Sequence, residues 1–318
     1  MADEIQYAAP KKKRKKEKKE PLTGKKKTVK TILNVIIVLF SALFLLSAVE
    51  IVIAQSAYRE VDRQNEELRE EYEPEVRPYV PTGSNGHSGD KPHRYEDSSS
   101  TEEPASDTPS EVTSEPTSEP AKEPEKQTKK ETPDEKLIRL RKSYPDVVGW
   151  LKMDGNHINY VFVQGKDNAE YVRSNLSKKY LISGTLFLDY ESPKDFSSFN
   201  TVMYGHNMRN DSMFGDLDRY EKKSYFDSHQ TGTVILPNTD YHLEVFAFLV
   251  VKSTDPILYD CNIETDEEKQ AFLDYAKKNA RQYRDIGVTI DDKILTLSTC
   301  AYEFDGARCI LLCKAIEY

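Results

Sequence analysis

Three side chains in the C-terminal half of this 318-residue chain have the chemistry of acyl transfer. Cys300 closes the apolar run KILTLSTC, so its thiol is expected at the end of a strand, where a nucleophile can be partly exposed. His206 follows the strand-like stretch Thr201–Tyr204. Arg308 begins the next apolar run, and hairpin pairing across residues 301–306 would bring its guanidinium near the thiol.

Together these side chains form a minimal set for acyl transfer. A thiolate attacks a carbonyl carbon, an imidazolium protonates the leaving amine, and a cation helped by backbone N–H groups stabilises the oxyanion or grips substrate carbonyls. Each residue alone has a plainer interpretation: a surface or packing histidine, a buried structural cysteine and a surface arginine. The chain order His, Cys, Arg does not fit papain-type or wall-peptide cysteine hydrolases, in which Cys precedes His.

The other histidines and cysteines are assigned to less demanding roles. The remaining histidines belong to the polar linker, to turns or to strands: His87, His93, His157, His229 and His242. Cys309 and Cys313 lie four residues apart in a strand-like run, which places them about 13 Å apart, too far to form a disulfide. Cys261 is expected to be inert as well. No pair of cysteines has zinc-ligand spacing, so neither a metal nor a cofactor is expected.

Short runs rich in β-branched and aromatic residues predict a mostly β domain that begins near Thr132. The predicted strands are Val147–Leu151, Ile158–Val163, Gly184–Asp189, Thr201–Tyr204, Gly232–Leu236, Tyr241–Val251, Lys293–Ser298 and Arg308–Ala315. Two helices interrupt them, Asn168–Leu176 and Thr265–Tyr283, and the second opens with the capping box TDEE. The capping box TPDE opens the domain itself. Mostly strands with few helical insertions favour a closed or nearly closed barrel.

A long apolar stretch near the N-terminus predicts a retained membrane anchor. Residues 32–54 read ILNVIIVLFSALFLLSAVEIVIA, and as a helix they span about 34 Å, enough to cross a hydrocarbon core. Residues 1–30 hold twelve Lys/Arg against four acidic residues, which places the N-terminus in the cytoplasm and argues, with the adjoining span, against nucleic-acid binding. A cleaved signal peptide is the alternative, because AQSA at 54–57 resembles a cleavage site, but the apolar stretch is long for a signal core.

These patterns divide the chain into four parts. Residues 1–30 form a basic cytoplasmic tail, and residues 31–54 form the transmembrane anchor. Residues 55–133 combine a polar extracytoplasmic helix with a linker from Pro74 onward, which is rich in Pro, Ser, Thr and Glu and is predicted to be disordered. Residues 134–318 form the catalytic domain, which is long enough for one hydrophobic core.

The motifs around the three reactive side chains resemble those of class B sortases. TVMYGHNM is followed by SMFGDL, and LTLSTC is followed by an arginine eight residues later. The layout of residues 134–318 is similar too, including a long helix between the strand that ends near Val251 and the strand that carries Cys300. The resemblance implies a mostly β fold, an eight-stranded sortase-type β-barrel with helical insertions, preceded by one transmembrane helix and a disordered linker.

The resemblance also implies roles for individual residues. It makes His206, Cys300 and Arg308 catalytic. It assigns four further side chains to the substrate groove: Tyr204, Ser298, Asn168 and Val172. The implied reaction cuts a C-terminal sorting signal after its Thr through a thioester, and then transfers the protein to an amine of a peptidoglycan precursor.

The implied partners are surface proteins that bear such a signal, the cell-wall precursor of a Gram-positive bacterium and the membrane, without nucleic acid. The implied location is the cell membrane, with a single span, a cytoplasmic N-terminus and an extracellular catalytic domain. Two alternatives remain open: a wall-facing cysteine peptidase that hydrolyses peptides, and a non-catalytic wall-binding module on the same barrel. Incorporation of an added amine into the product separates the transferase from the peptidase.

Overall fold

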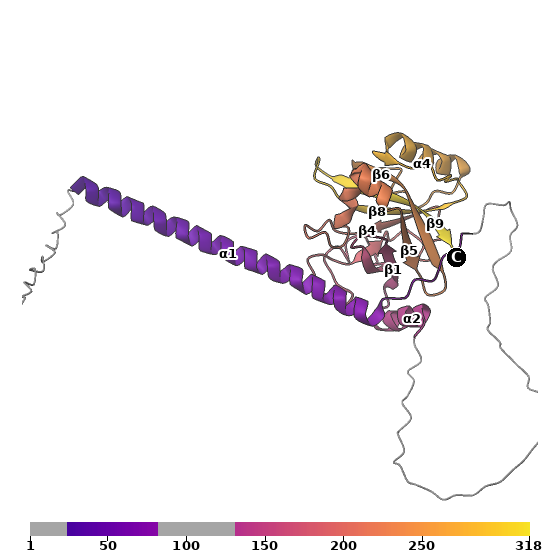
Figure 1. The fold of residues 1–318 in the computed structure, drawn as a ribbon, viewed down its shortest axis with the longest axis horizontal. Helices are drawn as coiled ribbons and strands as arrows, with labels where there is room; N and C mark the ends of the chain where they lie inside the picture. Colours follow the sequence, from indigo (N-terminus) through magenta and orange to yellow (C-terminus); the bar gives the residue numbers. More distant parts are fainter. Residues whose placement is uncertain (1–23, 82–130) are drawn as a thin grey trace, which may run out of the picture. The chain divides into compact units, whose positions relative to one another are not determined.

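The computed structural model describes residues 24–81 and 131–318, and the chain divides after Asp62 into two compact units. The first unit holds most of helix α1 (Gly24–Tyr72; Figure 1). Among the described residues, this is the one helix whose length and composition suit a membrane span. The predicted polar helix after the anchor is the unbroken continuation of α1. Residues 1–23 of the predicted tail and residues 82–130 of the predicted linker lie outside the described residues.

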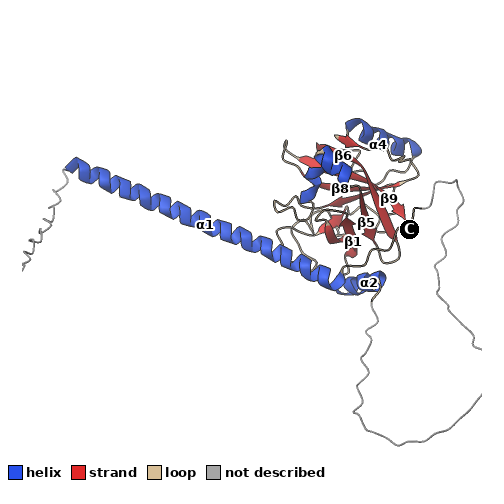
Figure 2. Ribbon diagram, viewed as in Figure 1, coloured by secondary structure: helices blue, strands red, loops and turns tan. Residues whose placement is uncertain are grey.

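Eight strands of the second unit close into a β-barrel, as the resemblance implied (Figures 1 and 2). They are β1 (Val147–Met153), β2 (Asn159–Val163), β3 (Leu186–Leu188), β4 (Asn200–Tyr204), β5 (Thr231–Ile235), β6 (Asp240–Lys252), β8 (Lys293–Cys300) and β9 (Ala307–Glu317). Their order is β5-β1-β2-β3-β4-β8-β9-β6, and pairing of β6 with β5 closes the ring. The pairs β2–β3 and β4–β8 are parallel and the others are antiparallel.

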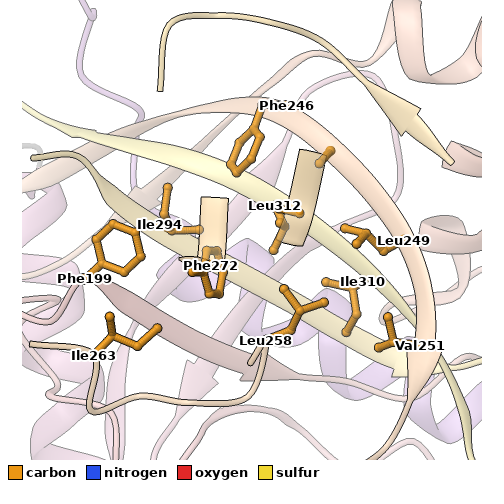
Figure 3. Packing of buried hydrophobic residues seen from close by; sticks show 12 residues of the cluster. Phe199, Phe246, Leu249, Val251, Leu258, Ile263, Phe272, Ile294, Ile310 and Leu312 are labelled. Atoms are coloured by element: carbon orange, nitrogen blue, oxygen red, sulfur yellow. The ribbon is translucent and has the colours of Figure 1, made fainter. Parts of the chain in front are cut away.

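Helix α4 (Asp266–Asn279) packs against the sheet and buries part of one face. Its side chains Phe272 and Ala276 are fully buried in a cluster that strands β6, β8 and β9 supply in large part. The other buried members include the residues shown in Figure 3: Phe199, Phe246, Leu249, Val251, Leu258, Ile263, Ile294, Ile310 and Leu312. Burial of a phenylalanine contributes about 1.5–3 kcal/mol, so this helix is held by packing rather than by its own propensity.

The helix starts follow the sequence closely. Helix α2 (Pro133–Ser143) begins with the predicted capping box, in which Thr132 accepts from the N–H of Glu135 and the Glu135 carboxylate accepts from the N–H of Thr132. Thr265 and Glu268 form the same arrangement at the start of α4. Both capping boxes are therefore confirmed, because the orphan N–H groups of a first turn find their partners within three residues.

The predicted helix at residues 168–176 is wrong, since this segment forms turns instead. Its start is helix-like, because the Asp167 carboxylate accepts from two following N–H groups. The carbonyls farther along are used by distant partners: Tyr171 O accepts from the N–H of Thr185, and Val172 O lies 2.7 Å from Nε2 of His206. Carbonyls engaged in this way do not receive the i→i−4 bonds that would continue a helix.

Three short elements went unpredicted. Strand β7 (Gln282–Tyr283) extends the sheet beside β6, within the stretch predicted as the end of the long helix. The helix stops at Asn279 because the N–H groups of Arg281 and Arg284 donate to carbonyls of β6. The other two elements follow His206: a 3-10 helix η1 (Gly215–Glu221) and helix α3 (Lys223–Ser228).

Residues 73–81, called the strap below, pack against the barrel, although the linker was predicted to be disordered from Pro74 onward. The ring of Tyr79 stacks on His242 with centroids 4.1 Å apart, and the Tyr318 hydroxyl donates to the carbonyl of Arg77 at 3.0 Å. The Arg77 guanidinium lies 2.7 Å from the fully buried Asp240 carboxylate. An aromatic stack and a buried ion pair thus order this part of a stretch whose composition is typical of disorder.

Candidate active site

Parallel pairing of β4 with β8 brings the histidine and cysteine segments to the same edge of the barrel. Tyr204 and Ser298 are register partners near the ends of these strands. Beyond them, the N–H of Gly205 donates to Ser298 O at 3.1 Å, and the hydroxyl of Thr299 donates to Gly205 O at 2.8 Å. His206 and Cys300 follow directly, so the two reactive side chains leave adjacent strand ends.

Gly205 makes this close approach possible because it has no side chain. A Cβ atom at this position would lie 2.4 Å from Cδ2 of Leu186 and 2.7 Å from the ring of Phe214. Asn207 adds a further tie, since its Nδ2 donates to the carbonyl of Cys300 at 2.9 Å. The loop that carries the histidine is therefore fixed to the strand that carries the cysteine on both sides of His206.

The third side chain arrives from the next strand of the hairpin. Arg308 on β9 is the register partner of Cys300 on β8, the pairing that the sequence indicated. Its Nη1 donates to the carbonyl of Ala307 at 2.9 Å. Cys300, His206 and Arg308 together line one cavity of about 300 Å³. The structure thus places a thiol, an imidazole and a guanidinium around a single hollow.

The four predicted groove residues line the same cavity: Asn168, Val172, Tyr204 and Ser298. Their polar groups form hydrogen bonds with neighbouring residues. The hydroxyl of Tyr204 donates to the Asp189 carboxylate at 2.8 Å, and the Ser298 hydroxyl lies 2.8 Å from the hydroxyl of Tyr259. The ring of Tyr204 stacks on Tyr259 with centroids 6.0 Å apart. The wall is therefore a rigid aromatic surface with fixed polar atoms.

His206 is partly buried, and its hydrogen bonding indicates which nitrogen carries the proton. Nε2 lies 2.7 Å from the carbonyl oxygen of Val172. A carbonyl oxygen only accepts, so Nε2 is the protonated nitrogen and Nδ1 is the one that can exchange a proton. Burial lowers the pKa of His206 below its ordinary value, and the bond to Val172 opposes this effect in part. The imidazole is therefore held in a single tautomer.

The cysteines differ in access to solvent. Cys300 is partly exposed, whereas Cys261, Cys309 and Cys313 are buried. Burial raises the pKa of the Cys261 thiol to about 11 and that of Cys309 to about 12, and it raises the pKa of Cys313 further. A thiol that stays protonated in the interior is a poor nucleophile. Cys300 is the cysteine suited to attack a substrate.

Comparison with known proteins identifies the family. A model of the sortase domain matches residues 151–316, just over half of the chain. The chain belongs to the sortase family. This sortase is 32% identical over 180 residues to sortase B of Staphylococcus aureus, covering 56% of this chain and 73% of the relative. It is 37% identical over 175 residues to sortase B of Listeria monocytogenes, covering 54% of this chain and 69% of the relative.

Solved sortase B structures are similar as well. The substrate complex of Staphylococcus aureus sortase B has a TM-score of 0.54 and 30% identity, covering 57% of this chain and 85% of that chain. Sortase B of Clostridium perfringens has a TM-score of 0.54 and 31% identity, covering 56% and 98%. A sortase B complexed with triglycine has a TM-score of 0.54 and 31% identity, covering 57% and 86%. The barrel and the enzyme class, a cysteine transpeptidase, agree with the resemblance found in the sequence.

The sortase cavity also includes residues that the sequence did not single out: Thr185, Phe187, Gly205, Ser253, Tyr259 and Thr299. Phe187 lies in the predicted strand Gly184–Asp189, and that prediction gave it no place beside the site. Tyr259 belongs to an irregular stretch after β6, and only tertiary contacts bring it to Tyr204 and Ser298. In the part of the sortase that the structure describes, no group of three or more His, Cys, Asp or Glu residues could hold a metal ion.

Proposed function

We propose that this sortase uses Cys300 as its nucleophile, His206 as its proton donor and acceptor, and Arg308 as its oxyanion or carbonyl-binding cation. The observation that carries the proposal is the shared cavity, in which these three side chains meet. The substrate is a surface protein with a C-terminal sorting signal that is cut after its Thr. The acceptor is an amine of a peptidoglycan precursor.

The chemistry balances with the groups present. The Cys300 thiolate attacks the carbonyl carbon of the Thr residue, and the resulting oxyanion is stabilised by the Arg308 guanidinium and nearby N–H groups. Protonated His206 gives its proton to the leaving amine, and a thioester remains. In the second half, the acceptor amine attacks the thioester, His206 takes up the amine proton, and the Cys300 thiolate leaves.

Two solved relatives support the choice of substrate and acceptor. The Staphylococcus aureus sortase B structure contains a substrate, and another sortase B structure contains triglycine, a peptide with a free amine. Both have the same barrel as this chain at 30% and 31% identity. A substrate and a peptide with a free amine are the two reactants that transpeptidation requires.

The test compares two cysteine variants of the full-length chain in detergent. A panel of Pro-x-Thr peptides is incubated with triglycine, and the products are identified by mass spectrometry. Cys300→Ala should abolish both cleavage and amine transfer, because no other accessible thiol faces the cavity among the described residues. The matched control is Cys261→Ala, a buried cysteine outside that cavity, which should retain turnover. An active Cys300→Ala protein would refute the proposal.

The same assay separates the alternatives. Cleavage without amine incorporation would favour a wall-facing cysteine peptidase. Absence of cleavage, together with absence of Cys300 labelling by a thiol-reactive substrate analogue, would favour a binding module. Incorporation of triglycine at the cut Thr supports the transpeptidase.

We also propose that α1 anchors the protein as a single membrane span, with the basic N-terminus in the cytoplasm and the catalytic domain outside. The support is one helix of suitable length and apolarity next to a Lys-rich N-terminal sequence. Epitope tags at either end of the chain, probed with protease on intact cells, test the topology. Loss of the C-terminal tag alone is the expected result, and loss of the N-terminal tag alone contradicts it.

A further inference from the structure

A buried carboxylate behind the cavity wall holds two of the residues that line the cavity. Asp189 follows β3, is 6% exposed, and does not itself line the hollow. Its Oδ2 accepts from Nδ2 of Asn168 at 2.7 Å and from the hydroxyl of Tyr204 at 2.8 Å. We propose that Asp189 is a positioning residue for peptide binding, which fixes the donor and acceptor pattern of Asn168 and Tyr204. The inference rests on the proposed function of this cavity.

Asp189 is itself anchored from several directions. Its N–H donates to Val202 O on β4 at 2.8 Å, and its carbonyl accepts from Nε2 of the buried Gln164 at 2.8 Å. Its second carboxylate oxygen, Oδ1, accepts from the N–H of Glu191 at 3.0 Å. An aspartate whose backbone N–H, backbone carbonyl and two carboxylate oxygens all form hydrogen bonds keeps its orientation. Asp189 can therefore orient the side chains that donate to it.

Tyr204 needs such a partner because ring packing alone leaves its hydroxyl proton undirected. The ring lies between Phe187, with centroids 5.3 Å apart, and Tyr259. Burial and the neighbouring Asp189 raise the pKa of Tyr204, so the hydroxyl keeps its proton. The hydroxyl donates this proton to Oδ2 of Asp189. The Tyr204 oxygen keeps a lone pair with which it can accept a further hydrogen bond.

Asn168 is fixed in the complementary sense. Its Oδ1 accepts from the N–H of Tyr190 at 3.0 Å, and one Nδ2 hydrogen points to Asp189. This pair of bonds excludes the flipped amide, because a flipped side chain would set its oxygen against the carboxylate and its amino group against the N–H. The second Nδ2 hydrogen remains as a donor. Asn168 and Tyr204 therefore offer one donor and one acceptor, a pattern complementary to a peptide group of an extended substrate.

The two residues depend on Asp189 because they come from separate segments. Asn168 lies in the turns after β2, and Tyr204 ends β4, 36 positions later in the chain. Their side chains converge on the same oxygen, Oδ2 of Asp189. Removal of this oxygen frees the Asn168 amide to rotate and the Tyr204 proton to turn toward the cavity. Peptide binding should weaken, whereas the reactive groups at Cys300 stay in place.

The experiment measures kcat and KM for the sorting peptide and for triglycine with full-length protein in detergent. Asp189→Leu removes both acceptor oxygens, and Asp189→Asn keeps one carbonyl oxygen that can accept from the two partners. We expect Asp189→Leu to raise the peptide KM by about 10-fold or more, and Asp189→Asn to raise it less. The KM for triglycine should change less than about 2-fold in both. The matched control is Asp195→Asn, since this exposed carboxylate accepts from Ser197 N and lies away from the cavity.

A double-mutant cycle distinguishes positioning from a general structural role. If Asp189 acts through its two partners, Asp189→Leu should add little to the peptide KM once Tyr204→Phe and Asn168→Ala are both present. Additive effects would overturn the inference. So would an Asp189→Leu protein whose peptide KM matches that of Asp195→Asn.

The variants also cover the case of misfolding. Should Asp189→Leu fail to fold by thermal melting, Asp189→Asn carries the test, and an unchanged peptide KM in that variant overturns the inference. Wild-type protein without peptide turnover would overturn the proposed function and this inference with it. An active wild type beside an unaffected Asp189 variant overturns only the inference.

Discussion

Nε2 of His206 lies 2.7 Å from the carbonyl oxygen of Val172, a residue 34 positions earlier in the chain. This contact gives the imidazole its tautomer and leaves Nδ1 as the unprotonated nitrogen. The backbone of Gly184 lies close to this carbonyl, since a Cβ atom at Gly184 would lie 2.3 Å from the same oxygen. The lack of a side chain at Gly184 therefore leaves the room that the Val172 carbonyl occupies beside His206.

Gly184→Ala should lower both stability and turnover. Gly184 has φ of +58°, and its added methyl group would push the Val172 carbonyl away from His206. We expect a loss of about 1–3 kcal/mol in the free energy of unfolding, together with a lower kcat. Urea denaturation and peptide turnover measure the two effects. The matched control is Gly287→Ala, which has φ of +71° but no atom within 4 Å of the added Cβ. Equal kcat values in the two variants would contradict the role given to Gly184.

The lowered pKa of His206 predicts how stability depends on pH. Because the folded protein resists protonation of this imidazole, the unfolded chain binds more protons below the ordinary histidine pKa near 6.5. The neutral His206 imidazole therefore contributes to the stability of the folded protein at pH 7.5. This contribution is lost as the pH falls through 6.5 toward the lower pKa that His206 has in the folded state. Melting temperatures at pH 5.5 and 7.5 should therefore differ less in His206→Gln than in the wild type. An unchanged difference would show that His206 titrates as a free imidazole does.

Replacement of Arg308 should reduce catalysis more than stability. A cation that stabilises the oxyanion typically contributes about 10²- to 10³-fold to turnover, so Arg308→Ala should lower kcat/KM by that order. Arg308→Lys keeps the positive charge but loses the planar guanidinium group, so its kcat/KM should lie between those of the wild type and Arg308→Ala. The control is Lys314→Ala on the same strand, which removes the ion pair with Asp292. An Arg308→Ala protein with wild-type kcat/KM would exclude a role in the reaction.

The strap should contribute to stability through its buried ion pair. Arg77→Ala leaves the fully buried Asp240 carboxylate without the guanidinium that lies 2.7 Å away, and we expect a cost of about 3 kcal/mol. The double variant Arg77→Ala/Asp240→Asn should recover part of this cost. Arg139→Ala, which breaks exposed pairs with Glu71 and Glu131, should cost less than about 1 kcal/mol. Similar costs for Arg77→Ala and Arg139→Ala in urea denaturation would contradict the prediction.

The stability of the Arg77→Ala variant should also depend on pH, because Asp240 can take up a proton. Burial raises the pKa of Asp240 to about 6, against an ordinary value of 3.8. The folded state therefore binds the Asp240 proton more tightly than the unfolded chain does. Protonation of Asp240 thus adds to the stability of the folded state, and this added stability is lost as the pH rises from about 4 through 6. Loss of the Arg77 charge should raise the pKa further. The stability cost of Arg77→Ala should then be larger at pH 7.5 than at pH 5, and the reverse order would exclude this explanation.

Features with local physical causes could be predicted from the amino-acid sequence. Short runs rich in β-branched and aromatic residues, bounded by turn signals, predicted all eight barrel strands to within two residues at either end, because such side chains favour the extended backbone of a sheet. The capping boxes at Thr132 and Thr265 fixed two helix starts within a single turn. The strand-end positions of His206 and Cys300, and the hairpin that pairs Cys300 with Arg308, also follow from short stretches of sequence.

Features that depend on residues far away in the chain could not be predicted in this way and became visible in the folded barrel. The segment at 168–176 lost its predicted helix because its carbonyls bind Thr185 and His206 instead. The strap is ordered by Asp240 and His242, which lie more than 150 residues away, although its composition predicts disorder. Asp189 and Tyr259 carry no motif and acquire their importance from the side chains they contact. Local patterns record the preferences of neighbouring residues, whereas hydrogen bonds and burial between distant segments form only when the barrel closes.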